Sequence, residues 1–280
     1  MTHVDAHHHL WNPLRGDYGW MPANDRTLSR TYGPADLTEA LAHTDVSQTV
    51  LVQAAATLNE TEYLLGLADA CPTVAKVVGW INFEDERELG TLKRLANHPK
   101  FAGVRPMIQD LSDDNWMLSA DIQWAFRALI DLDLTFDCLG FCRHLANFHT
   151  LLTRYPDLRA VIDHCMKPQI RDGSEAHFQM WSDGLKRIAE DTLARCKLSG
   201  LATEADVDWS TETLKPYADH VINVFGAERV MWGSDWPVVR LRMEYGDWYH
   251  MCQKLTASLS DTDRTKIFSA TARRFYRIKP

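Results

Sequence analysis

Short apolar segments alternate with amphipathic segments along nearly the whole chain, and this alternation limits the possible folds more than any other sequence feature. The apolar segments have the length and β-branched content of buried strands. Eight are predicted, at residues 4–10, 48–55, 74–83, 101–108, 134–139, 158–164, 194–199 and 229–233. Helical periodicity predicts the elements between and after them, at residues 35–43, 59–68, 84–97, 122–132, 145–155, 178–190, 214–225 and 262–276.

This alternation is typical of a parallel sheet whose strands are joined by right-handed helical crossovers. An open sheet with helices on both faces is the alternative, but no Gly-rich fingerprint follows the first strand. No linker divides the 280 residues. The sequence therefore predicts one domain over residues 1–280, folded as a (β/α)₈ TIM barrel. Asn59 with Glu62 is expected to cap the second helix, and Ser260 the last one.

Composition and charge narrow the possible partners. The net charge of −8 is spread along the chain and no basic cluster tracks a phosphate backbone, so nucleic acid is not an expected partner. No apolar run is long enough to cross a bilayer, and the N-terminus lacks the plan of a signal peptide, so no membrane partner and a cytoplasmic location are expected. Six cysteines without C-x-x-C spacing indicate buried, reduced thiols.

The first predicted strand contains three consecutive histidines framed by native-looking sequence. Because side chains alternate along a strand, His7 and His9 project from the same face as Asp5, and His8 projects from the other. Two imidazoles on one face are suited to share a metal ion or a substrate oxygen. The alternative is that one of them only caps or packs.

Other polar residues follow later strands at the same predicted end of the barrel, where active sites of this fold lie. Unpaired polar groups are costly to bury, so this many strand-end residues indicate a shared cavity. The residues are Gln53, Arg105, His164, Lys167, Lys197 and Asp235. Asp235 is suited to orient a water and to contact a metal, although a turn aspartate is the simpler alternative. His164 has the alternative of a core histidine bonded to a backbone carbonyl.

The remaining candidates are expected to bind a small-molecule substrate. Arg105, Lys167 and Lys197 are candidates for binding a carboxylate or ring hydroxyls, with Gln53 as a neutral partner; salt bridges to Asp5 or Asp163 are the alternative. The long loop over residues 12–34 is expected to be functional. Aromatic side chains near the strand ends are expected either to wall a sugar-sized pocket or simply to pack. They are Trp11, Trp20 and Trp236.

Three motifs together resemble the amidohydrolase superfamily. They are D-A-H-H-H-L-W at 5–11, V-I-D-H-C-M-K-P at 161–168 and W-G-S-D-W-P at 232–237, and the similarity runs from residue 4 to residue 276. More narrowly, the chain is similar to the lactonase branch, which includes sugar lactonases such as fuconolactonases and rhamnonolactonases as well as dicarboxylate lactonases. The resemblance implies a distorted TIM barrel with a hydrolytic site built on His7, His9, His164 and Asp235.

The resemblance also sets expectations for the cofactor and the reaction. Members with two metals use further histidines, but the fifth strand, T-F-D-C-L-G, supplies none. We therefore expect one divalent metal, zinc before others, held by the four residues named above, or catalysis without a metal. The predicted reaction opens the ester of a lactone, foremost a sugar lactone. In it Asp235 is the general base, and His7, His9 and His164 polarise the carbonyl. A decarboxylase of the aminocarboxymuconate type and a non-catalytic ligand-binding barrel are the alternatives.

Overall fold

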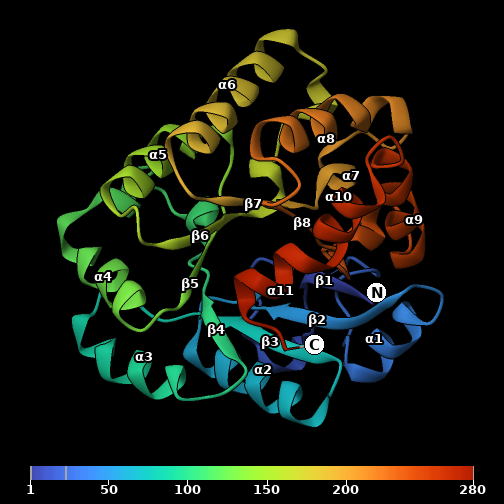
Figure 1. The fold of residues 1–280 in the computed structure, drawn as a ribbon. Coiled ribbons are helices and arrows are strands. Elements are labelled where there is room, and N and C mark those ends of the chain that lie inside the picture. Colours follow the sequence, from blue (N-terminus) through green and yellow to red (C-terminus); the bar gives the residue numbers. More distant parts are fainter. Residues whose placement is uncertain (1, 23, 280) are drawn as a thin grey trace.

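The computed structural model describes residues 2–22 and 24–279, and eight parallel strands form its centre (Figure 1). Neighbours in the sheet are neighbours in the sequence, from β1 to β8. The barrel closes where the backbone N–H of His9 donates to the carbonyl of Trp236 over 2.7 Å. The predicted TIM barrel is confirmed. Its strands are β1 His3–His8, β2 Val46–Val52, β3 Val74–Gly79, β4 Phe101–Val104, β5 Thr135–Cys138, β6 Arg159–Ile162, β7 Arg195–Leu198 and β8 Val230–Trp232.

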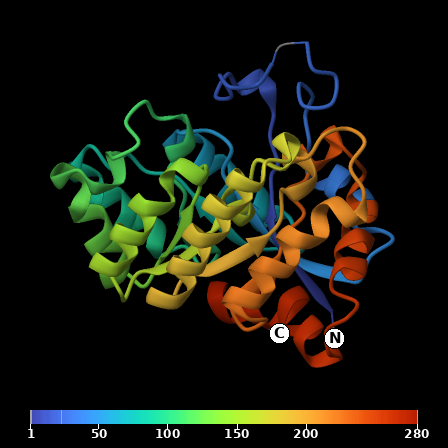
Figure 2. The same ribbon diagram turned by 90° about the horizontal axis from the view of Figure 1, so that it is seen from above.

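Helices surround the strands, and the 12–33 loop projects above one end of the barrel (Figures 1 and 2). None of these helices, within the part of the chain that is described, is long and apolar enough to cross a membrane. All six cysteines are buried and free, as expected. The helices are α1 Pro34–Leu41, α2 Leu58–Ala70, α3 Leu89–Ala96, α4 Gln123–Asp131, α5 Leu145–Arg154, α6 Glu175–Asp191, α7 Leu201–Glu204, α8 Thr211–Phe225, α9 Tyr245–Leu255, α10 Asp261–Thr265 and α11 Thr271–Tyr276.

Two local predictions about helix ends have different outcomes. The capping box at Asn59 and Glu62 is wrong, because Thr57 caps α2 by accepting the backbone N–H of Glu60. The buried Glu60 carboxylate folds back to accept the backbone N–H groups of the turn at residues 54–55, so it serves the strand end instead. Ser260 does cap the last helical segment, although a π-helical turn at Lys266–Ala270 divides that segment into α10 and α11.

The strands β3 and β4 end earlier than predicted. The sequence suggests strand character as far as residues 83 and 108, but β3 ends at Gly79 and β4 at Val104. Pro106 has no N–H for a ladder hydrogen bond, which is consistent with the end of β4 just before it. A 3₁₀ turn, Ile108–Asp110, follows. The shortened strand therefore leaves residues 105–110 as a loop above the barrel end.

The barrel interior has an apolar lower part and a charged upper part. The lower part is packed by α11, whose Phe275 and Tyr276 contact a cluster that includes Val4, Val50 and Val161. Above it lie two carboxylates and two cations, all buried. The Lys197 ammonium contacts Asp137 at 2.5 Å and Asp163 at 2.9 Å. Arg105 Nη1 contacts Asp163 at 3.4 Å, and the Tyr276 hydroxyl donates to Asp137 over 2.9 Å.

The cluster of Arg105, Asp137, Asp163 and Lys197 is called the interior ion cluster below. Each charge has an opposite partner, as buried charges require. Burial opposes the ionisation of Asp163, but Lys197 and His7 hold the pKa of this carboxyl well below its usual range. Burial raises the pKa of Asp137 to about 6, so both carboxyls are ionised at neutral pH. Formal charge within the cluster is then balanced.

Replacement of the central cation tests whether the interior ion cluster stabilises the fold. We expect Lys197→Met to lower the free energy of unfolding by about 3–5 kcal/mol, because it leaves buried carboxylates uncompensated. Adding Asp137→Asn should recover part of that loss, which urea denaturation of the single and double variants will measure. Lys215→Met is the control, since its partner Asp219 lies on the surface of α8 and exposed pairs contribute less than about 1 kcal/mol. Equal losses in the two lysine variants would contradict this account.

Candidate active site

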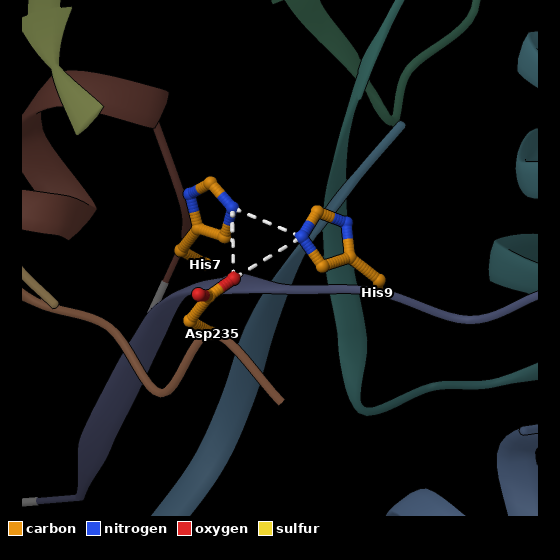
Figure 3. Close-up of side chains that lie close together, drawn as sticks. All are labelled: His7, His9 and Asp235. Carbon is orange, nitrogen blue, oxygen red and sulfur yellow. Dashed lines mark hydrogen bonds and ion pairs between the residues drawn. The ribbon is translucent and has the colours of Figure 1, made fainter. Parts of the chain in front are cut away.

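Four of the predicted site residues meet at the carboxyl ends of three strands. His7 lies near the end of β1, His9 directly follows it, His164 follows β6 and Asp235 follows β8. All four side chains are buried. Figure 3 shows His7, His9 and Asp235 pointing toward one another. His8 points the other way, as predicted, and its Nε2 lies 2.9 Å from the Thr49 hydroxyl.

The atoms that face one another are three imidazole nitrogens and one carboxylate oxygen. His9 Nε2 lies 3.2 Å from His7 Nε2 and 3.3 Å from Asp235 Oδ1. His7 Nε2 and His164 Nε2 each lie 3.8 Å from the same Asp235 oxygen. Four donors around a tetrahedral zinc-like ion with bonds of about 2.0–2.1 Å are separated by roughly 3.3–3.4 Å. His7, His9 and Asp235 offer ligand atoms within 4.8 Å of one another, so these three fit one divalent metal ion, and His164 Nε2 lies beside the same carboxylate oxygen.

Protonation states also suit metal binding or proton transfer. Burial lowers the pKa of His7, His9 and His164, the last to about 4, so all three imidazoles are neutral at pH 7. Burial opposes the ionisation of Asp235, but contacts with His164 and His9 leave the pKa of this carboxyl below its ordinary value. Three neutral nitrogens and one carboxylate oxygen form a donor set that binds divalent ions.

Hydrogen bonds behind the imidazoles fix their orientation. His9 Nδ1 lies 2.8 Å from the Val52 carbonyl, to which only an N–H can donate, so Nε2 of this ring keeps its lone pair. His164 Nδ1 lies 2.9 Å from the Ser199 hydroxyl. His7 Nδ1 faces the interior ion cluster, 3.5 Å from the Asp163 carboxylate, which can accept an N–H, and 3.0 Å from the Lys197 ammonium. Such outer partners commonly set the orientation of metal-binding histidines.

The backbone around these residues is specialised. His164, Cys165, Met166 and Lys167 all have positive φ, between 48° and 58°, and form a left-handed turn. The two middle residues point into the core, whereas the first and last line the cavity above the barrel. Asp235 also has a positive φ, of 55°. Its loop is held by Asp5, whose carboxylate accepts the Ser234 backbone N–H at 2.9 Å and the Ser234 hydroxyl at 2.6 Å.

Glycine is required beside two of the imidazoles. A Cβ on Gly200 would lie 2.7 Å from the His164 Cβ, and one on Gly233 would lie 2.8 Å from the His7 Cβ. Gly200 also has a φ of 70°, which side chains rarely adopt. The glycines that follow β7 and β8 therefore give the imidazoles room at the strand ends.

A cavity of about 230 Å³ opens over the four residues, and three of the four border it. Polar and apolar side chains both line it. Of the residues predicted to bind substrate, Arg105, Lys167, Trp11 and Trp20 line the cavity. Trp11 donates its indole N–H to the carbonyls of Leu28 and Arg30, which anchors the 12–33 loop beside His9. The complete lining is His9, Trp11, Trp20, Ala54, Arg105, Met107, Gln109, Asp110, Leu139, His164, Lys167, Asp235 and Val238.

Three other candidates for substrate binding do not line this cavity. Lys197 is fully buried in the interior ion cluster, so the alternative of a salt bridge describes its contacts. Gln53 is buried as well, and it exchanges hydrogen bonds with the backbone and guanidinium of Arg105. Trp236 packs edge-on against Tyr32, with ring centroids 5.1 Å apart. In these positions Lys197 contacts His7, and Gln53 forms hydrogen bonds with Arg105.

Sequence reasoning missed several cavity residues on the loop after β4. Met107, Gln109 and Asp110 line the cavity, but residues 107 and 108 were assigned to a strand. Pro106, which cannot continue a ladder, was the signal that the loop begins there. Ala54 after β2, Leu139 after β5 and Val238 after β8 complete the missed part of the wall.

Comparison with known proteins covers the whole chain. An L-fucono-1,5-lactonase from Burkholderia ambifaria is 40% identical over 280 residues, which is 98% of this chain and 95% of the relative. An L-fucono-1,5-lactonase from Burkholderia multivorans is 32% identical over the same shares of the two chains. A Burkholderia multivorans amidohydrolase crystallised with HEPES has a TM-score of 0.94 at 30% identity, with both chains fully covered. A second crystal form of an amidohydrolase from that organism, with zinc bound, has a TM-score of 0.93 at 29% identity, again with both chains fully covered.

The family itself follows from a direct match. The family model described as amidohydrolase matches residues 4–278. These residues include all eight strands except for His3, the first residue of β1. The resemblance inferred from the three motifs is thereby confirmed, and the chain belongs to the amidohydrolase family.

Proposed function

We propose that this protein is a lactonase that hydrolyses the ester bond of a sugar lactone at the site of His7, His9, His164 and Asp235. The observation that carries the proposal is the meeting of a buried carboxylate with three neutral imidazoles under a small cavity. The full-length likeness to two L-fucono-1,5-lactonases supports lactone hydrolysis. A cavity of about 230 Å³ suits a single small molecule rather than a polymer chain.

Asp235 is the general base in this proposal. All three contacts with the imidazoles involve its Oδ1, and Oδ2 takes part in none of them. One oxygen can thus stay in the donor set while the other accepts a proton from a water that faces the cavity. As the water oxygen bonds to the carbonyl carbon, the ring C–O bond breaks. The proton taken by Asp235 then passes to the leaving oxygen, which leaves a hydroxy acid.

The residues that would hold a metal are His7, His9, His164 and Asp235. Zinc is the ion that we propose for this position. A divalent ion there would polarise the lactone carbonyl as a Lewis acid. The zinc-bound amidohydrolase from Burkholderia multivorans supports this choice. The chain's own contribution is to hold three buried, neutral imidazoles with their Nε2 atoms 3.3–3.8 Å from one carboxylate oxygen, Asp235 Oδ1. Arg105, which lines the cavity, would add a fixed positive charge near the lactone carbonyl.

Asp235→Asn tests the general base. We expect turnover of sugar lactones to fall by about 10²–10⁴-fold, because the amide cannot accept the proton. Acid release followed with a pH indicator measures it, and circular dichroism checks that the fold is retained. The control is Asp208→Asn, which removes the same charge from an exposed position. Wild-type rates in Asp235→Asn, or carbon dioxide as a product of the wild type, would refute the proposed reaction.

Metal removal tests the donor set separately. We expect the purified protein to contain about one zinc per chain, because His7, His9 and Asp235 offer three ligand atoms within 4.8 Å of one another. Elemental analysis should show that His9→Ala loses this zinc, whereas His43→Ala, at an exposed position, keeps it. Treatment with a chelator should lower lactone turnover, and added zinc should restore it. Full activity in protein proven to be free of metal would limit the four residues to direct hydrogen-bond catalysis.

A further inference from the structure

The wall of the cavity carries two opposite charges that the proposed chemistry does not use. Lys167 and Asp110 both line the cavity, and neither forms an ion pair with any residue in 2–22 or 24–279. The other cation on the wall, Arg105, is already paired with Asp163. Lys167 is half-buried, and Asp110 lies at the exposed rim.

Gln109 lies between these two charges and joins them. The Lys167 ammonium donates to Gln109 Oε1 over 2.6 Å, and Gln109 Nε2 donates to Asp110 Oδ1 over 3.3 Å. The amide orientation is therefore determined from both sides. Arg143 also donates to the backbone carbonyl of Gln109 over 3.2 Å, which fixes the loop. We call Lys167, Gln109 and Asp110 the rim triad.

The rim triad presents a donor and an acceptor on either side of the Gln109 amide. A ring hydroxyl both donates and accepts, so neighbouring hydroxyls of a sugar can accept from Lys167 and donate to Asp110. A carboxylate only accepts, and placed at the same point it would lie beside a second carboxylate. The rest of the wall near this point is apolar at Met107, Leu139 and Val238, and its other cation, Arg105, is already paired with Asp163.

We propose that Asp110 is a specificity-determining residue, an inference that rests on the proposed lactonase function. Held by Gln109, its carboxylate admits uncharged polyhydroxylated lactones and rejects lactones that carry a carboxylate. Lys167 binds the ring hydroxyls in both cases, and the carboxylate at position 110 decides between the two classes. The exposed position of Asp110 makes the discrimination sensitive to salt.

The test compares two lactones that differ at one carbon. One is the lactone of an aldonic acid, and the other is the lactone of the matching aldaric acid, with a carboxylate in place of the terminal hydroxymethyl group. We expect the wild type to prefer the first in kcat/KM. Asp110→Asn keeps the size of the side chain but removes the charge, and should reduce that preference by about tenfold or more. Asp121→Asn, which removes the same charge from an exposed site away from the cavity, should leave the preference unchanged.

Two further measurements separate this proposal from the lactonase function. Raising the salt concentration should weaken the wild-type preference but not that of Asp110→Asn, a response that a purely steric role would not give. Calorimetric binding of the corresponding lactams, which resist hydrolysis, reports the same preference without turnover. If the lactams show the preference and no lactone is hydrolysed, the lactonase function fails and the specificity role stands. A preference that is equal in wild type and Asp110→Asn overturns the role of Asp110.

Discussion

The structure depends first on the contact of the Lys197 ammonium with two buried carboxylates, Asp137 and Asp163. Moving such charges out of water costs several kcal/mol per ion, so they persist only when each has a close opposite partner. The strands β5, β6 and β7 each contribute one of these charges at or just beyond the strand end, so the contact also fixes the alignment of these strands. The same ammonium lies 3.0 Å from His7 Nδ1 and, together with burial, keeps that imidazole neutral. The alignment of β5, β6 and β7 and the charge state of His7 thus share one interaction.

Charged groups near the barrel end therefore fall into two kinds according to their depth. Arg105 and Lys197 are satisfied by Asp163 and Asp137, and their positions are determined by the protein alone. Lys167 and Asp110 reach the cavity from loops and have no opposite charge within ion-pair distance among the described residues. Groups of the first kind shape the electrostatic field before any ligand arrives, which costs no reorganisation during a reaction. Groups of the second kind remain available for recognition.

The sequence predicted the barrel because each strand is a short apolar run and each crossover carries a helical stripe. The four residues His7, His9, His164 and Asp235 were also predictable, because they directly follow or end such runs, at one end of a parallel barrel. The depth of a side chain was not predictable in this way. Lys197 and Arg105 both lie near strand ends, yet only Arg105 borders the cavity. Which of two such cations is buried below the cavity depends on the carboxylates that other strands bring near it. The order of residues in the sequence does not show which cation pairs with which carboxylate.

The loop residues show a second limit, which is set by the backbone. A left-handed turn costs roughly 1–2 kcal/mol for each residue with a side chain. Four such residues in a row, His164 to Lys167, are therefore not expected from propensity. The turn persists because its middle residues are fully buried and bonded: the Trp181 indole N–H donates to the Cys165 carbonyl over 2.7 Å, and the Cys165 thiol lies 3.2 Å from the Lys197 carbonyl. A right-handed turn with the same ends would not place its side chains in these positions. The strained turn lets one short segment supply both the imidazole that faces Asp235 and the ammonium that donates to Gln109, so the proposed reaction site and the proposed recognition site are linked through four residues.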